Sequence, residues 1–272
     1  MMVLIKIILI VAVVLAALYV LSTAGRAGHP GLDELKGWKY AHRGLHDENL
    51  PENSMAAFRA ALEHGYGIEL DIHLMKDGRL AVIHDTSLLR TAGADVNITD
   101  LTLEDLPNYP LNDRGELIPT FEQVLELFAG KAPLIIELKE DGNCRKVVKA
   151  AVKAMEGYEG PYCMESFHPG CVYELKKHYP HIIRGQLTMD YFKEEDSPLP
   201  KIIKWLITNQ AENFLTKPDF IAYRFADRKT FSNILTMKFW KLQGVTWTLK
   251  SQEELDEAEA EGWLPIFEGF KP

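Results

Sequence analysis

The stretch ELDIHLMKDGRLAVIHD, residues 69–85, decides how many strands the fold contains. Polar and apolar side chains alternate over residues 67–72, and a second apolar run covers residues 80–84. Only KDGR separates the second run from the LDIHL strand, whereas a parallel crossover needs roughly a dozen residues or more. The second run is therefore predicted to fold back on the first as an antiparallel hairpin.

Outside the hairpin, short apolar runs alternate with helix-length segments, as they do in a parallel sheet. The segment SMAAFRAALEHG is typical of these helices, with Asn53 as its predicted N-cap and Gly65 as its stop. Eight strands are predicted besides the returning arm of the hairpin: Lys39–His42, Gly67–Ile72, Pro133–Leu138, Tyr162–Glu165, Ile182–Leu187, Asp219–Tyr223, Val245–Leu249 and Leu264–Phe267. This order predicts an α/β fold, a (β/α)8 TIM barrel with a β-hairpin after its second strand and an active site at the carboxyl ends of the strands.

Composition excludes several classes of protein. The 272 residues are 47% hydrophobic and 25% charged, which is typical of a globular domain rather than a disordered chain. The net charge is −9 and no basic block occurs, so nucleic acid is not an expected partner. The three cysteines, Cys144, Cys163 and Cys171, are odd in number, which predicts no disulfide framework and favours a reducing compartment.

The N-terminal stretch MMVLIKIILIVAVVLAALYVLSTAG, residues 1–25, is apolar except for Lys6. Its length predicts an N-terminal transmembrane helix that anchors the protein to a membrane. The alternative is a signal peptide cleaved near Ser22-Thr23-Ala24. Residues 26–37 are predicted to be a linker and residues 38–272 the barrel. The flanking charges do not decide on which side of the membrane the barrel lies.

Acidic side chains occur at predicted strand ends, where the fold predicts an active site. Residues two apart on a strand share a face, so Glu69 and Asp71 point the same way. Two unpaired buried carboxylates would cost several kcal/mol, so we expect a cation between them; the alternative is a solvated face or a pairing with Lys or Arg. The next barrel strand, in PLIIELKE, adds Glu137 and Lys139. Three carboxylates suit an octahedral oxygen site for a divalent metal.

Two histidines and an arginine leave strand ends at the same mouth. His42 and Arg43 follow the first strand in KYAHRG, and His84 closes the hairpin in AVIHD. Two histidines with near-neutral pKa can divide general acid and general base duties. The guanidinium of Arg43 matches the geometry of phosphate oxygens.

In its ordered motifs the chain resembles the glycerophosphodiester phosphodiesterase family, a group of phospholipase C-like phosphodiesterases with a TIM barrel. The resemblance covers about residues 38–272. It depends on an ordered set of motifs, several of which occur at predicted strand ends. The motifs are HRG at 42–44, PENS at 51–54, ELD at 69–71, HD at 84–85, ELK at 137–139, ESF at 165–167 and WTL at 247–249. The segment that follows HD, residues 86–119, is short, and Glu268 stands where an aspartate is common in the family. These departures bear on the choice of substrate.

The resemblance implies roles for individual residues: Glu69, Asp71 and Glu137 as ligands of one Mg²⁺ or Ca²⁺ ion, His42 and His84 as general acid and base, Arg43 and Lys139 on the phosphate oxygens, and Trp247 and Phe167 in the pocket wall. The implied reaction is metal-dependent hydrolysis of a glycerophosphodiester to glycerol-3-phosphate and an alcohol, with the glycerol 2-hydroxyl forming a cyclic phosphate first. We expect His73 to support this site, Asp85 to orient its neighbours, and His168 to be a surface residue.

Three alternatives remain open from the sequence. The same barrel and mechanism could serve a lysophospholipase D that takes lysophospholipids at the membrane. A barrel that binds phosphodiesters without catalysis is the second alternative. The segment SPLPKIIKWLITNQAENFLTKP, residues 197–218, is predicted to be a barrel helix with one buried face, or else a lip that lies on lipid beside the anchor.

Overall fold

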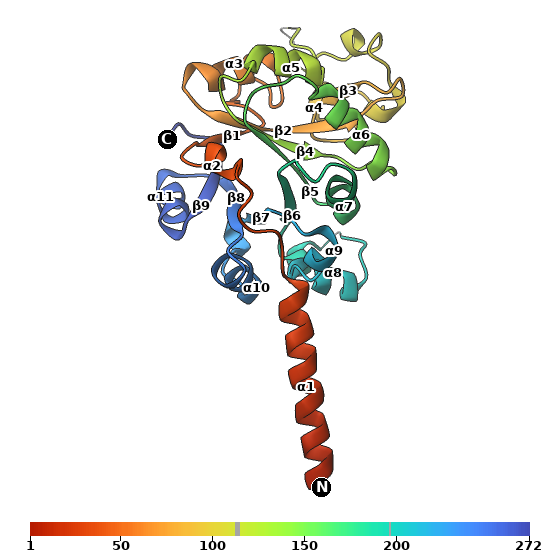
Figure 1. Cartoon of the computed structure of the whole chain (residues 1–272). Helices are drawn as coiled ribbons and strands as arrows, with labels where there is room; N and C mark the ends of the chain where they lie inside the picture. The colour runs from red at the N-terminus through yellow and green to blue at the C-terminus, as the bar shows by residue number, and fades with distance from the viewer. Residues whose placement is uncertain (112–114, 196) are drawn as a thin grey trace.

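A computed structural model describes residues 1–111, 115–195 and 197–272. The strands are β1 (Tyr40–His42), β2 (Gly67–Leu74), β3 (Leu80–Val82), β4 (Leu134–Leu138), β5 (Tyr162–Ser166), β6 (Arg184–Thr188), β7 (Phe220–Arg224), β8 (Gln243–Leu249) and β9 (Trp263–Phe267). They are ordered β1-β9-β8-β7-β6-β5-β4-β2-β3, and β1 also pairs with β2 (Figure 1). All pairs are parallel except β2 with β3, so eight strands close into the predicted TIM barrel.

The predicted hairpin is confirmed. Strand β3 pairs with β2, antiparallel, with Ile72 opposite Val82. Gly78 supplies the left-handed residue of the turn, at φ 84°, and Met75 N–H donates to the carbonyl of Arg79 across it. A loop this short leaves the chain no route to a parallel neighbour.

Helices and turns of helix connect the strands. The helices are α1 (Met2–Ser22), α2 (Leu32–Leu35), α3 (Met55–Glu63), α4 (Leu89–Ala92), α5 (Phe121–Phe128), α6 (Cys144–Ala154), α7 (Pro169–His178), α8 (Lys201–Thr208), α9 (Asn213–Thr216), α10 (Phe231–Asn233) and α11 (Gln252–Glu261). The 3₁₀ turns are η1 (Ile98–Asp100), η2 (Leu106–Asn108), η3 (Tyr191–Lys193) and η4 (Phe225–Asp227), and η5 (Ile234–Phe239) is a π-helical turn.

The predicted N-cap of α3 was wrong by one residue. The cap is Ser54, whose side chain accepts a hydrogen bond from the backbone N–H of Ala57. Asn53 instead takes a positive φ of 52° and turns its side chain into the barrel mouth, towards Asp71. Both Ser and Asn are good caps, so composition alone did not separate them. The side chain of Asn53 bonds Asp71 in the barrel mouth instead, and Ser54 is left to cap the helix.

The barrel interior changes from apolar to polar along its axis. At the amino ends of the strands, α2 places Leu32 and Leu35 against strand residues that include Tyr40 and Phe220. The hydroxyl of Tyr40 also donates to the carbonyl of Leu35. Part of the segment at residues 26–37 is therefore packed into the barrel at the amino ends of its strands. This apolar plug leaves only the opposite end of the barrel open to polar ligands.

Helix α1 projects from the barrel as a single rod (Figure 1). Its 21 residues have no buried side chain, and it is long and apolar enough to cross a membrane. A signal sequence passes the same test of length and composition. Helices α8, α9 and α10 surround the end of α1 where it meets the barrel (Figure 1).

Candidate active site

Carboxylates form a row across neighbouring strands at the barrel mouth. Asp71 of β2 stands beside Glu137 of β4, and Glu137 stands beside Glu165 of β5. Two residues earlier on β2, Glu69 stands beside His42 of β1. All four acids are buried. The strand register therefore gathers acidic side chains that are almost 100 residues apart in the sequence.

Three of these acids form a compact group. One oxygen each of Glu69, Asp71 and Glu137 lies within 4.8 Å of the others. Lys139 places its Nζ 2.9 Å from Asp71 Oδ1 and 2.8 Å from Glu137 Oε1. The structure thus brings together the residues that the sequence predicted as metal ligands and the lysine predicted beside them.

The charges of the group do not balance. Burial raises the pKa of Glu69 well above its usual range, and the charges of Asp71 and Glu137 raise it further. Burial opposes ionisation of Asp71 as well, but the positive charges of Lys139, His84 and Arg43 together outweigh it and lower the pKa of that carboxyl. Together with Glu165, four buried carboxylates face the cations Lys139 and Arg43. A hard divalent cation with oxygen ligands would offset the excess negative charge, so the residues present fit such an ion.

Asn53 and Arg43 hold the carboxylates from the loop above β1. Asn53 Nδ2 donates to Asp71 Oδ2 at 2.8 Å, and Arg43 Nε lies 3.5 Å from the same oxygen. The backbone N–H of Arg43 donates to Glu69 Oε2 at 3.2 Å. Arg43, like Asn53, has a positive φ, of 55°. These contacts fix two of the three acids before any ligand binds.

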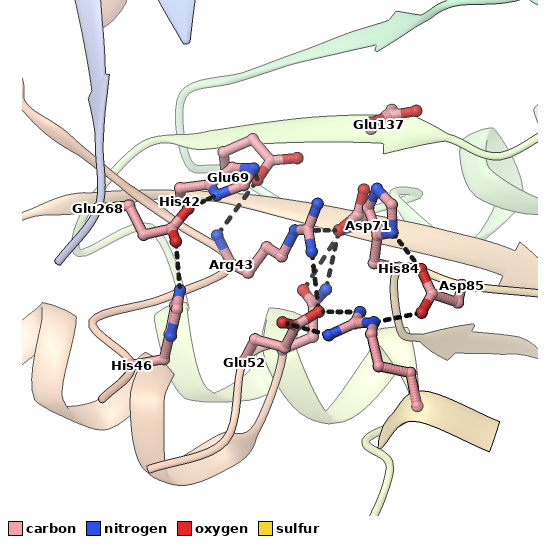
Figure 2. A network of polar contacts seen from close by, with 12 residues as sticks. His42, Arg43, His46, Glu52, Glu69, Asp71, His84, Asp85, Glu137 and Glu268 are labelled. Atoms are coloured by element: carbon pink, nitrogen blue, oxygen red, sulfur yellow. Dashed lines mark hydrogen bonds and ion pairs between the residues drawn. The ribbon is translucent and has the colours of Figure 1, made fainter. Parts of the chain in front are cut away.

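Both predicted catalytic histidines are held by a carboxylate (Figure 2). His42 Nδ1 lies 2.5 Å from Glu268 Oε2, and His84 Nδ1 lies 2.6 Å from Asp85 Oδ1. Each contact orients the ring and leaves Nε2 for the site; that of His42 is 3.8 Å from Glu69 Oε2. Burial lowers the pKa of both histidines, and the carboxylate contacts oppose that shift. Asp85 therefore orients His84, as the sequence predicted.

A chain of ion pairs joins the second histidine to the arginine (Figure 2). Asp85 Oδ2 lies 2.5 Å from Arg90 Nε, and Arg90 pairs with Glu52 at 2.7 Å. Glu52 in turn pairs with Arg43 at 2.8 Å. Three side chains, Asp85, Arg90 and Glu52, thus connect His84 to Arg43, so the position of one depends on that of the other.

The two remaining histidines of the sequence analysis lie where they were expected. His73 places Nδ1 2.6 Å from Asp141 and Nε2 3.0 Å from the carbonyl of His84, so it supports the backbone that carries His84. The side chain of His168 is 53% exposed, and its Nδ1 accepts from the N–H of Gly170 to cap α7.

Two cavities meet at the carboxylates. The smaller, about 40 Å³, lies over the site and is lined by residues that include His42, Arg43, Glu69, Glu165, Phe167 and Trp247. The rings of Phe167 and Trp247 meet edge to face at 5.5 Å, so both form the pocket wall. The larger cavity, about 470 Å³, is lined by His84, Glu137 and Lys139 and also by Leu199, Ile203 and Ile207. This groove therefore has a charged part and an apolar part.

Sequence reasoning missed four polar residues of the site as participants. Glu165 was recognised only as part of the motif ESF, although it is an acid at a predicted strand end, as Glu137 is. Glu268 was noted only as a departure from the family pattern. Glu52 and Asn53 lie in PENS, which carries no local sign of where its side chains point.

Comparison with known proteins gives one family. A family model described as the glycerophosphoryl diester phosphodiesterase family matches residues 42–267. A glycerophosphodiester phosphodiesterase of Bacillus altitudinis is 37% identical over 175 residues, which are 60% of this chain and 71% of that protein. One of Caldanaerobacter subterraneus is 38% identical over 160 residues, 54% and 65% of the two chains. A human lysophospholipase D is 37% identical over 116 residues, 38% of this chain and 36% of its own.

Solved structures share the fold. A phosphodiesterase of Oleispira antarctica, in complex with the product sn-glycerol-3-phosphate, superposes with a TM-score of 0.72 at 20% identity over 89% of this chain and 95% of that one. A glycerophosphodiester phosphodiesterase of Thermotoga maritima has a TM-score of 0.64 at 25% identity, covering 84% and 93%. Both likenesses agree with the closed barrel described above.

Proposed function

The chain belongs to the glycerophosphoryl diester phosphodiesterase family of enzymes, and on this premise we propose that it hydrolyses glycerophosphodiesters to glycerol-3-phosphate and an alcohol. We further propose that Glu69, Asp71 and Glu137 hold one divalent cation, Mg²⁺ or Ca²⁺. The Oleispira antarctica phosphodiesterase of the same fold holds sn-glycerol-3-phosphate as its product, which supports a small glycerophosphodiester as the substrate here.

One observation carries the proposal. His42 and His84 flank the carboxylate cluster on opposite sides, with Arg43 between them (Figure 2). Each histidine is bonded through Nδ1 to an acid, at 2.5 Å from Glu268 and 2.6 Å from Asp85. Two such histidines on either side of a phosphate would meet the attacking and the leaving oxygen of an in-line displacement.

In the proposed first step, one histidine takes the proton of the attacking glycerol 2-hydroxyl through Nε2. The bond from that oxygen to phosphorus forms while the bond from phosphorus to the alcohol breaks. The other histidine gives its proton to the leaving alcohol oxygen. Water then opens the cyclic phosphate with the two histidines in exchanged roles, which returns both to their starting protonation. Glu268 and Asp85 stabilise whichever imidazolium forms.

The cations of the site would bear the phosphate charge. Arg43 presents its guanidinium between the histidines, and Lys139 lines the larger cavity beside Asp71 and Glu137. A bound divalent cation would neutralise charge on the phosphoryl oxygens and raise the electrophilicity of phosphorus. Trp247 and Phe167 would exclude water from one side of the substrate.

Glycerol-3-phosphate release by the full chain in nanodiscs tests the proposal. Glycerophosphocholine and glycerophosphoglycerol serve as substrates, each with Mg²⁺, Ca²⁺ or a chelator. We expect turnover of the diesters that depends on the metal and falls at least about a hundredfold in His42→Gln. Metal-independent turnover would remove the ion from the proposal, and no turnover with metal bound would favour the alternative of a non-catalytic binding barrel.

A second candidate function is lysophospholipase D activity, favoured by the shape of the larger groove. Its apolar part at Leu199, Ile203 and Ile207 could take an acyl chain while the head group stays at Lys139. The resemblance of this chain to a human lysophospholipase D over 116 residues supports the same reading. Lysophosphatidylcholine, scored by release of lysophosphatidic acid, separates the two. A marked preference for it over the short diesters would favour this candidate.

We propose that α1 remains in the mature protein as a single-pass membrane anchor. The candidate cleavage site is integrated into the fold, because Thr23 is fully buried and Ala24 is 8% exposed. Cleavage there would cut through a packed segment. The intact mass of protein purified from membranes tests retention, since loss of residues 1–25 would identify a signal peptide.

A further inference from the structure

The C-terminal end of α1 is fixed to the barrel by side chains. Tyr19 packs its ring 5.8 Å from that of Trp205, and its hydroxyl donates to the carbonyl of Asn209. Trp240 Nε1 donates to the carbonyl of Val20 and to Thr23 Oγ1, each at 3.1 Å. The helix is therefore held from two sides, by α8 and by the residue after η5.

The chain that follows α1 is held as firmly. Asn213 Nδ2 donates to the carbonyl of Thr23 at 3.1 Å, and Lys217 Nζ to that of Ala24 at 3.0 Å. Arg26 pairs with the buried carboxylate of Asp219 at 2.5 Å. No free hinge separates helix from barrel at these residues, so the direction of α1 sets the orientation of the barrel.

This attachment decides which part of the barrel lies nearest a bilayer. The 21 residues of α1 are about 32 Å long at 1.5 Å per residue, close to the roughly 30 Å thickness of the hydrocarbon core. The last turn of α1 would then lie at the interface with water. Helices α8, α9 and α10 stand around that turn (Figure 1). They connect β6 to β7 and β7 to β8, so they form part of the barrel's side wall.

This wall has unusually many exposed apolar side chains. After α1, twelve large apolar side chains are exposed in the part of the chain that the structure describes. Nine of them lie between residues 192 and 239: Phe192, Ile202, Ile203, Trp205, Phe214, Leu215, Phe231, Ile234 and Phe239. All of these except Phe192 belong to α8, α9, α10 or η5. A concentration of this kind marks a surface that another apolar phase covers.

The charge of the wall is opposite to that of the whole chain. Residues 201–239, from the start of α8 to the end of η5, contain seven Lys and Arg and three acids, in a protein of net charge −9. The three acids, Glu212, Asp219 and Asp227, are all buried, whereas Lys201, Lys229 and Lys238 are exposed. Exposed aromatic and aliphatic side chains mixed with lysine are typical of surfaces that lie on anionic lipid.

We propose that the barrel lies with this wall, formed by α8, α9, α10 and η5, on the anionic surface of the bilayer that α1 spans. The proposal rests on the anchor role proposed for α1 and not on the catalytic activity. It commits to the lipid surface as occupant because the wall is continuous with α1 and because its charge is complementary to anionic lipid. The apolar part of the groove at Leu199 and Ile203 would then open close to the interface.

Spin labels on the full chain in nanodiscs test the position of the wall. The partly exposed Cys144 is first replaced by serine, and the other two cysteines are buried. One new cysteine at a time is then introduced for labelling, as Ile202→Cys, Phe214→Cys or Ile234→Cys. The matched control is Leu89→Cys, since Leu89 is 58% exposed like Ile234 but lies on α4, away from the wall. Nanodiscs contain phosphatidylglycerol with phosphatidylcholine. Collision with oxygen, which concentrates in lipid, is compared with collision with a water-soluble nickel complex.

We expect the oxygen-to-nickel collision ratio at the three wall positions to exceed that at position 89 severalfold. Equal ratios at wall and control would overturn the proposal. Spin–spin broadening at the wall positions would also overturn it, because a second copy of the chain would then cover the surface. A preparation whose intact mass lacks α1 would overturn it as well. None of these readouts needs turnover, so they are independent of the proposed reaction.

Discussion

Two regions of the molecule depart from the usual distribution of side chains: the mouth of the barrel buries charged ones, and the wall beside α1 exposes apolar ones. At the mouth, the charged side chains of Glu69, Asp71 and Glu137 are buried. At the wall, large apolar side chains such as Ile202 and Phe214 are exposed, at 63% and 60%. Soluble domains bury apolar side chains and expose charged ones, so neither region is explained by the stability of the isolated barrel.

The difference between the two regions indicates which kind of partner would stabilise each of them. Buried like charges need a cation and an anionic ligand to offset their repulsion, and exposed apolar side chains need a phase other than water. Both regions would therefore be stabilised by partners that the chain does not itself supply. The predictions below separate the two, because a change at the mouth should alter chemistry and a change at the exposed surface of the wall should alter only access to lipid.

The largest effect is expected from Glu69→Gln, which keeps the shape of the side chain and removes its charge. We expect kcat/KM for glycerophosphocholine to fall about a thousandfold or more, because a ligand of the ion is lost. We expect Mg²⁺ or Ca²⁺ to raise the Tm of the wild type and to leave the Tm of this variant unchanged. Thermal shift with and without metal checks this. Glu122→Gln, a partly exposed acid of α5, is the control and should retain both properties.

A smaller loss is expected when the histidines are changed but the ion site is kept. His84→Gln should lower kcat by about 10²- to 10³-fold while the metal-induced shift in Tm remains. Asp85→Asn and Glu268→Gln should lower it by roughly 10- to 100-fold, since they only orient a ring. Initial rates with KM measured separately check the order. His64→Gln, on the exposed end of α3, should be neutral; equal losses from His84 and Asp85 variants would contradict the division of roles.

At the wall, the double change Lys201→Glu and Lys238→Glu should affect only lipid-borne substrate. Each lysine near an anionic surface contributes about 1 kcal/mol, so turnover of lysophosphatidylglycerol in phosphatidylglycerol nanodiscs should fall severalfold. The rate with soluble glycerophosphocholine should not change. Lys149→Glu with Lys153→Glu, on the exposed face of α6, supplies the same change of charge elsewhere. A similar loss with the control pair would show a general effect of net charge.

The smallest effect is expected at Glu212, which is buried in the wall with no hydrogen bond to either oxygen among the described residues. Burial raises the pKa of this carboxyl to about 8. The folded state therefore binds a proton that the unfolded chain releases near pH 4.3, so stability should fall as pH rises from about 4.3 to about 8. Glu212→Gln should raise Tm by a few degrees at pH 8.5 and hardly at pH 4.5. A pH-independent difference would contradict this.

Much of the fold was predictable because it depends on local pattern. Each of the eight barrel strands was placed to within two residues at either end, and the hairpin followed from a four-residue loop that cannot carry a crossover. The grouping of Glu69, Asp71 and Glu137 followed from the period of a strand and from the rule that parallel strands end at one face.

Contacts between segments that are distant in the chain could not be predicted from the sequence. Glu268 holds His42 across 226 residues, and Asn53 leaves its expected capping position to bond Asp71. Residues near 32–35, read as a linker, close the amino end of the barrel. None of these residues has a neighbour in the sequence that reveals its partner.

The sequence by itself determined the order of strands and helices, the residue types at each strand end and an apolar helix ahead of the barrel. Only the tertiary structure decided which acids orient the histidines, and which wall of the barrel α1 is fastened to. The physical reason is that periodicity and turn chemistry act within a few residues, whereas side-chain pairing depends on strand register and barrel closure. Those are set by the whole chain.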